Sequence, residues 1–288
     1  MCDPMPAFTA TPSQQAEAAA WFAALRDRIC AAFEALEDQL QGTDRAQPPG
    51  RFVRSTWQRP DPSGDGGGGT MAAMRGRVFE KVGVNISTVH GVFSEEFRRQ
   101  IPGASGDGKF WAGGISLVAH LRSPLVPAVH MNTRLIVTEK SWFGGGADIT
   151  SMFPDSAAAQ ADAAQFHAAF KAACDRHDPA YYPRFKQSCD DYFFLPHRNE
   201  PRGLGGIFYD NHNTGDFAAD MAFTRDVGEA FRHQLLGDRD HLRDVLGRPR
   251  VALRPLEVQG VEIAEERLDV GRGELVERDA FLLRPADG

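Results

Sequence analysis

The chain has 288 residues, of which 42% are hydrophobic and 25% charged, a balance typical of a globular protein rather than a disordered chain. A formal charge of −7 argues against a general nucleic-acid-binding protein, because such proteins usually carry a positive excess. No apolar run reaches the roughly 18 residues that a membrane span requires, and the amino terminus has no secretory signal, so we predict a cytoplasmic protein without stable membrane insertion.

The amino-terminal part of the chain is predicted to begin with a helix. Residues 13–40 carry apolar side chains at three- and four-residue steps, and Ser13 is the candidate N-cap. Residues 59–70 are predicted to be a loop, because proline and glycine at that density disfavour both helices and strands. The four cysteines form no CxxC pair and are predicted to be reduced thiols.

Alternation of apolar and polar side chains indicates several β-strands in the middle of the chain. The predicted strands are residues 82–88, 111–121, 128–138, 142–150 and 203–211. Helical periodicity predicts three more helices, at residues 155–175, 179–194 and 216–235, with Asp155 and Asp216 as N-caps of the first and the last.

The strand predicted at residues 128–138 has two different faces. One face is ordinary core material, made of Val129, Met131, Thr133, Leu135 and Val137. The other carries His130, Asn132 and Arg134 in a row. An imidazole can exchange protons near neutral pH and a guanidinium can hold a carboxylate through two hydrogen bonds. The pattern leaves two alternatives open, a solvated sheet face and a functional site.

A neighbouring strand would enlarge this polar group. If residues 111–121 pair with it around a turn centred near Leu125, His120 lies opposite His130 and Ser116 opposite Arg134. His167 and His197 supply two further imidazoles, although no short metal-ligand motif joins the four histidines. The glycine runs 66–69 and 144–146 lack the spacing of phosphate-binding loops, so we predict no nucleotide cofactor.

Long strings in a fixed order now point to a known family: GRVFEKVGVNISTVHG, GISLVAH, HMNTR, WFGGGADIT and CDDYFFLPHRNEPRGLGGIFYDN. Over roughly residues 10–235 the chain closely resembles the oxygen-dependent coproporphyrinogen-III oxidases of haem biosynthesis. The resemblance implies an α+β fold, with a large flat antiparallel sheet covered by helices on both faces, and a homodimer. It also implies a reaction, the oxidative decarboxylation of two propionates of coproporphyrinogen III to vinyl groups, which gives protoporphyrinogen IX.

The resemblance further assigns roles to individual residues. His130 is implied to be the catalytic proton donor, and Asp210 the acidic residue that handles the pyrrole nitrogens. The implied substrate contacts are Ser116, Asn132, Thr133 and Arg134. A divalent metal cation is the one candidate cofactor, with His120, His130, His167 and His197 as its implied ligands. No organic cofactor is implied, because O₂ is the co-substrate and reacts directly with the electron-rich porphyrinogen.

The resemblance stops near the end of the last predicted helix. Residues 1–235 are therefore assigned to the oxidase domain, and residues 236–288 to an atypical segment that contains none of the strings with which the family continues. Two explanations stay open, genuine divergence and translation in the wrong frame, since this segment is nearly free of aromatic residues. The alternative function is a catalytically impaired porphyrinogen-binding homologue, and a third hypothesis is an unrelated metal-dependent oxygenase.

Overall fold

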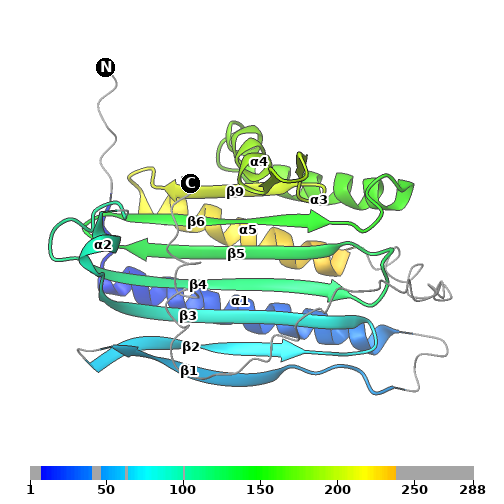
Figure 1. Ribbon diagram of the computed structural model, residues 1–288, viewed down its shortest axis with the longest axis horizontal. Helices are drawn as coiled ribbons and strands as arrows, with labels where there is room; N and C mark the ends of the chain where they lie inside the picture. Colours follow the sequence, from blue (N-terminus) through cyan, green and yellow to red (C-terminus); the bar gives the residue numbers. More distant parts are fainter. Residues whose placement is uncertain (1–7, 41–46, 62–63, 100, 238–288) are drawn as a thin grey trace.

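The computed structural model describes residues 8–40, 47–61, 64–99 and 101–237, and a single large sheet dominates them (Figure 1). Its seven strands are all antiparallel and lie in the order β1-β2-β3-β4-β5-β6-β9. The strands are β1 (Val53–Asp61), β2 (Gly64–Met74), β3 (Phe79–Val92), β4 (Lys109–Leu121), β5 (Ala128–Val137), β6 (Ser141–Thr150) and β9 (Gly206–His212). Two short strands, β7 (Phe194–Leu195) and β8 (Glu200–Pro201), pair separately.

The helices are α1 (Pro12–Gln39), α2 (Glu95–Arg98), α3 (Ala157–Asp175), α4 (Tyr181–Tyr192) and α5 (Phe217–Gly237). The predicted α+β architecture around a large antiparallel sheet is confirmed. In Figure 1, α1 and α5 lie behind the sheet, and α3 packs against α5. Helix α4 follows the β9 edge and contacts both faces, because Phe185 packs on Tyr209 and Tyr192 stacks on Phe208.

The main hydrophobic core lies between the sheet and the helices behind it. Strand alternation points Val84, Leu117 and Met131 to this side, where they meet α1 through residues such as Phe22 and Leu25, all of them almost fully buried. The apolar face predicted for residues 128–138 is therefore confirmed as core. The opposite face of the same strands is turned toward the viewer in Figure 1, and we call it the polar face.

Two predicted helix starts are shifted by one or two residues. Helix α1 is capped by Thr11, not Ser13, and Thr11 forms a capping box with Gln14. Helix α3 is capped by Ser156, not Asp155. The third prediction is confirmed, since Asp216 Oδ1 accepts the backbone N–H groups of Ala218 and Ala219 at the start of α5.

The prediction of a loop over residues 59–70 is wrong. Most of this segment forms the hairpin of β1 and β2, and the glycine run lies inside β2, paired with β1 on one side and β3 on the other. The reason is a close approach: a Cβ atom at Gly69 would collide with the backbone oxygen of Ile86 on β3 and would lie 2.9 Å from the ring of Trp57, its register partner on β1. Cβ atoms at Gly67 and Gly68 would likewise collide with backbone oxygens, those of Thr88 and Trp57, so these glycines let the neighbouring strands approach rather than form a turn.

The register predicted between residues 111–121 and 128–138 is wrong by two residues. Val118 lies opposite His130 and Ser116 opposite Asn132. The chain turns earlier than expected, since the backbone N–H of Val126 donates to the carbonyl of Ser123 at 3.3 Å, which places Pro124 at the second position of the turn. A shift by an even number of residues leaves every side chain on its predicted face.

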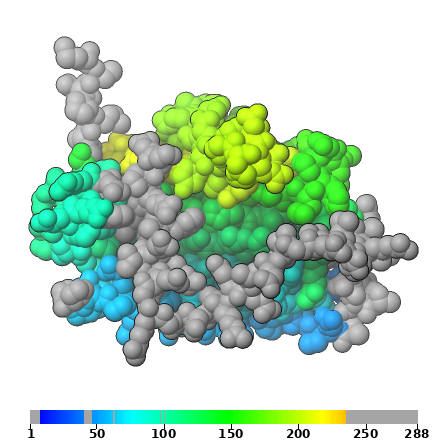
Figure 2. Space-filling model, viewed as in Figure 1, coloured from blue at the N-terminus to red at the C-terminus, as the bar shows by residue number. Residues whose placement is uncertain are grey.

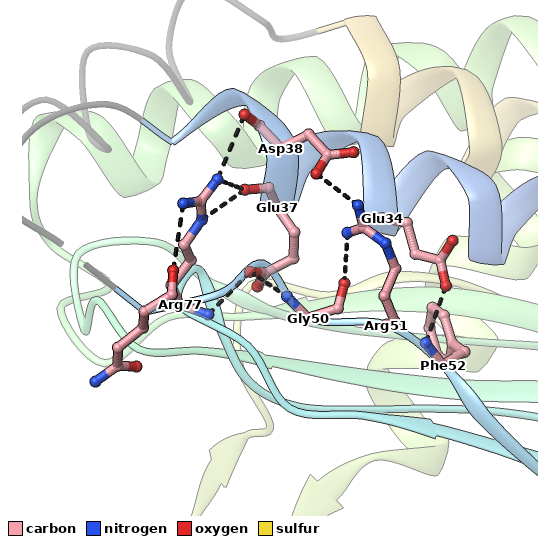
Figure 3. Close-up of polar contacts among 8 residues, drawn as sticks. Glu34, Glu37, Asp38, Gly50, Arg51, Phe52 and Arg77 are labelled. Atoms are coloured by element: carbon pink, nitrogen blue, oxygen red, sulfur yellow. Dashed lines mark hydrogen bonds and ion pairs between the residues drawn. The ribbon is translucent and has the colours of Figure 1, made fainter. Parts of the chain in front are cut away.

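A buried carboxylate joins the end of α1 to the sheet (Figure 3). Glu37 is fully buried, and its two oxygens accept four backbone N–H groups at 2.9–3.0 Å, from Gly50, Arg77, Val78 and Phe79. The Arg77 guanidinium donates to the main-chain oxygen of Glu37 from Nε at 2.8 Å and from Nη2 at 2.7 Å. We call this group the Glu37 cluster; it satisfies the carbonyl end of α1 as well as the entry to β3.

The cysteines that the structure describes are buried in helices. Cys30, Cys174 and Cys189 are free thiols, as predicted, and Cys2 lies outside the described residues. Burial raises the pKa of Cys30 to about 11 and the pKa values of Cys174 and Cys189 to about 12. Within the described ranges, no helix combines the length and the apolar character needed to cross a membrane.

Candidate active site

The polar face carries the residues that the sequence singled out on β5. His130, Asn132 and Arg134 all point to it, since Val129, Met131 and Leu135 point to the core. Asn132 and Arg134 are nonetheless buried, with 5% and 4% of their surfaces exposed. The face is therefore not a solvated one over β5, and the alternative of solvent-exposed decoration is not supported for these residues.

His130 and Asp148 form a close polar pair on this face. His130 Nδ1 lies 2.7 Å from Asp148 Oδ1, and the two side chains are 14% and 3% exposed. The pairing follows from the sheet, because the two residues are register partners on β5 and β6. A carboxylate at Nδ1 favours the tautomer with the proton on that nitrogen.

A second charge compensates the buried carboxylate. Arg202, in the segment between β8 and β9, places Nη2 at 2.9 Å from Asp148 Oδ2, so both carboxylate oxygens are paired. Sequence reasoning missed Asp148. The signal was present in the alternation of residues 142–150, which puts Asp148 on the same face as Gly144 and Gly146, but only the register with β5 shows that it meets His130.

Arg134 and Asp210 form another buried pair further along the face. Arg134 Nη2 lies 3.0 Å from Asp210 Oδ1, and each side chain is 5% exposed. Arg134 belongs to β5 and Asp210 to β9, so the guanidinium crosses the intervening strand β6. It passes over Gly144, its register partner, where a side chain would collide with it.

Three buried polar atoms of this group lack a hydrogen-bond partner within the described ranges. They are Asn132 Oδ1, Arg134 Nε and Asp210 Oδ1, although Asp210 Oδ1 lies within ion-pair distance of Arg134 Nη2. An unsatisfied buried polar group costs about 1–3 kcal/mol of stability, and such groups in native proteins call for an explanation. An acceptor and a charged donor kept unpaired side by side are suited to a ligand that brings its own N–H and carboxylate groups.

Aromatic and apolar side chains frame the polar group. Phe193 packs edge-on against His130 at 6.1 Å between ring centroids, and Arg202 lies 3.7 Å above the Phe193 ring. Beside His130 on β4, Val118 is 40% exposed. In Figure 2 the segment that contains α4 stands along the β9 side of this face, above the sheet. Toward α2 the same face carries a second apolar cluster: Val89, Phe93, Ile101, Ala104, Phe110, Ala112, Ile136 and Trp142.

The structure separates Thr133 from the other predicted substrate contacts. Its side chain points to the core, is fully buried, and its hydroxyl has no hydrogen-bond partner in the described part of the chain. Alternation along β5 makes this unavoidable, because residues next to one another in a strand face opposite sides. Ser116 does lie on the polar face, partly exposed, opposite Asn132 on β4.

The four histidines predicted to bind a metal do not form a metal site in the described residues. No three histidine, cysteine or acidic side chains there are placed to hold an ion. His167 is already satisfied, since its Nε2 lies 2.9 Å from the Leu204 carbonyl and its Nδ1 lies 3.0 Å from the Tyr182 hydroxyl. His120 and His197 are exposed, and neither stands in a group with His130 that could hold an ion. These donors, within one chain, do not fit a divalent cation.

Comparison with known proteins agrees with this combination of fold and polar face. The profile of the family described as coproporphyrinogen III oxidase matches residues 17–237. An oxygen-dependent coproporphyrinogen-III oxidase of Rickettsia bellii (strain RML369-C) is 58% identical over 210 residues, which cover 73% of this chain and 72% of the relative. Proteins of the same name from Rickettsia africae (strain ESF-5) and Rickettsia conorii (strain ATCC VR-613 / Malish 7) are 59% identical over the same shares.

A broad antiparallel sheet with a buried histidine–aspartate pair on one face is an arrangement suited to an enzyme. With identity at this level over most of the chain, the protein belongs to the oxygen-dependent coproporphyrinogen-III oxidase family. All the residues discussed on the polar face lie inside the matched region.

Proposed function

We propose that this chain converts coproporphyrinogen III to protoporphyrinogen IX with O₂ as the electron acceptor, and that the polar face over β5, β6 and β9 is its active site. One observation carries the proposal. His130, Asn132 and Arg134 lie in a row on one face, with Asp148 behind the histidine and Asp210 behind the arginine, in a chain 58% identical to oxidases of that name. Nothing observed favours an impaired homologue over an active enzyme.

Each of the two decarboxylations has the same balance of atoms and electrons. The bond between the carboxylate carbon and its neighbouring methylene breaks and CO₂ leaves. A hydride equivalent leaves the methylene next to the ring, and the two carbons become a vinyl group. O₂ accepts the two electrons and, with that hydrogen and one proton, becomes H₂O₂. The protein's task is thus to hold the carboxylates and to move protons, and both tasks suit the residues present.

The side chains divide these tasks by position. His130 exchanges a proton at Nε2, while Asp148 holds its Nδ1 and fixes the orientation of the ring. Arg134 and Asn132 bind a substrate carboxylate and a pyrrole N–H, respectively, through the atoms that have no partner in the described protein. Asp210 is engaged by Arg134, so we assign it to orienting that guanidinium rather than to direct proton transfer. Ser116 contributes a hydroxyl at the edge of the active site. The Thr133 side chain takes no part in substrate binding or catalysis.

Three further properties follow from the resemblance and belong to the proposal. We propose that the enzyme works as a homodimer in the cytoplasm and needs no organic cofactor. We derive no step through a metal ion, because the histidines that would hold it are separated within the chain. Light scattering at defined protein concentration tests the dimer, and turnover after treatment with a chelator tests the metal.

The decisive experiment compares two histidine variants. The enzyme is mixed anaerobically with coproporphyrinogen III, O₂ is admitted, and the oxidised porphyrins are separated by chromatography. We expect His130→Ala to lower turnover by about 10²–10⁴-fold, with an unchanged circular dichroism spectrum. His177 is the matched control, because it also bonds an aspartate at 2.8 Å, but it belongs to the segment between α3 and α4 and its partner Asp226 belongs to α5. Near-normal turnover in His130→Ala, or an equal loss in His177→Ala, would remove His130 from the mechanism.

A further inference from the structure

A single glycine of β6 lies beneath the Arg134–Asp210 pair. Arg134 reaches Asp210 by crossing β6 at Gly144. A Cβ atom added at Gly144 would lie 2.6 Å from Asp210 Oδ1, 2.9 Å from Arg134 Nε and 3.1 Å from Arg134 Cζ. The first two separations are shorter than real Cβ contacts, so the ion pair observed here requires a residue without a side chain at this position.

The neighbouring glycines are constrained by something else. A Cβ atom at Gly145 would lie 2.7 Å from the backbone oxygen of Asn132, and one at Gly146 would lie 2.9 Å from the Cα atom of Phe208. Both contacts involve the main chain of an adjacent strand, so those two glycines let the strands approach. Gly144 is different, because the nearest atoms belong to two flexible side chains, those of Asp210 and Arg134.

We propose that Gly144 is a positioning residue, whose missing side chain fixes the place of the Arg134 guanidinium and thereby the place where a substrate carboxylate binds. The proposal rests on the function proposed above. Because the atoms in the way are side-chain ends, a methyl group at 144 displaces the guanidinium without dismantling the sheet. Substrate binding suffers first, since a displaced guanidinium no longer meets the carboxylate through two hydrogen bonds.

The first test measures affinity in Gly144→Ala. Coproporphyrin III, the stable oxidised form with the same four carboxylates, is titrated by fluorescence. We expect its dissociation constant to rise by about fivefold or more, equivalent to about 1 kcal/mol, and the KM for coproporphyrinogen III to rise with it while kcat changes little. Gly83→Ala is the control, because its added methyl group would meet only Asn85 Nδ2, at 4.0 Å. A merely structural effect lowers kcat per mole of protein and leaves KM unchanged, which would overturn the proposal.

The second test asks whether Gly144 acts through Arg134. In an Arg134→Ala background, Gly144→Ala should weaken binding by less than about twofold more, because the group it displaces is gone. An equal fivefold effect in both backgrounds overturns the proposal. If Gly144→Ala does not fold, the triple variant with Arg134→Ala and Asp210→Ala decides, since both obstacles are then removed. Recovery of folded protein supports the proposal and continued failure overturns it.

A failure of the proposed function is distinguishable from a failure of this inference. Wild-type protein that binds no coproporphyrin III contradicts the proposed function. The crystal structure of Gly144→Ala tests the positioning role independently of any ligand. We expect Arg134 Nη2 and Asp210 Oδ1 to separate beyond hydrogen-bonding distance, and an ion pair retained at 3.0 Å overturns the inference.

Discussion

The Glu37 cluster and the Arg134–Asp210 pair both bury charge, yet they differ in how their polar atoms are satisfied. Each Glu37 oxygen accepts two backbone N–H groups, so its hydrogen bonding is complete within the chain. Around Arg134, the described protein leaves Arg134 Nε and Asn132 Oδ1 without partners. The two groups lie on different sides of the sheet, one joined to α1 and one on the polar face (Figures 1 and 3).

The difference separates groups that stabilise the fold from groups that bind a ligand. A buried carboxylate with four donors ties together segments distant in the sequence, and removing it leaves each donor unsatisfied. An unpaired donor and acceptor lower stability until something else binds to them. We therefore expect substitutions in the Glu37 cluster to change stability and leave catalysis intact, and substitutions on the polar face to do the reverse.

The largest effect on stability is expected from Glu37→Ala. Four backbone N–H groups lose their acceptor, and at about 1 kcal/mol or more for each the free energy of unfolding falls by about 4 kcal/mol. Urea denaturation measures the loss, and kcat per mole of folded enzyme stays unchanged. Glu34→Ala is the control, because Glu34 accepts a single backbone N–H, from Phe52, and its loss costs about 1 kcal/mol. Equal losses in the two variants would contradict the importance of the cluster.

A smaller change is expected from Asp148→Asn, and it concerns the activation free energy of the reaction rather than the free energy of unfolding. The amide keeps the shape of the carboxylate but no longer holds the imidazole in one tautomer or stabilises its protonated form. We expect kcat to fall by about 100-fold, which raises the barrier by about 2.7 kcal/mol, while the unfolding midpoint moves little. The comparison is Asp226→Asn, which makes the same change beside His177. If Asp148→Asn unfolds the protein as Glu37→Ala does, the His130–Asp148 pair belongs with the stabilising groups instead.

Much of the polar face was predictable, because it needs only the period of a strand. Once residues 128–138 form a strand, His130, Asn132 and Arg134 must share a face, and a shift of the register by two leaves that unchanged. Alternation within one strand cannot show which residue of the adjacent strand lies opposite a given side chain. Asp148 meets His130 because of the β5–β6 register, and the sequence does not state this register. The metal-binding histidines are implied by the family resemblance and not by any short ligand motif, and in this chain His167 is bonded to Leu204 and Tyr182.

The Glu37 cluster and the β2 glycines were not predictable for a related reason. Within α1 a glutamate next to an aspartate is typical of a solvated helix face, and only the return of the chain at residues 50 and 77–79 makes Glu37 a buried acceptor. Composition predicts a loop for the glycine run, because it reflects only the backbone conformations that glycine permits within its own segment. The role of this run depends on the backbone of the two neighbouring strands, β1 and β3, and on the Trp57 ring. Both errors concern contacts between segments far apart in the sequence.

The smallest predicted effect is a gain in stability, and it tests whether the core-facing side of β5 is separate from the ligand-binding side. Thr133→Val removes a buried hydroxyl that has no partner in the described protein and keeps the shape of the side chain. We expect the free energy of unfolding to rise by about 1 kcal/mol, because the unsatisfied group is gone, and turnover to stay at the wild-type level. Thr224→Val is the control, since its hydroxyl accepts the Tyr209 hydroxyl at 3.4 Å and its loss should destabilise the protein. Reduced affinity for coproporphyrin III in Thr133→Val would show that the core side of β5 also contributes to ligand binding. The two sides of β5 would then not divide into a stabilising side and a ligand-binding side.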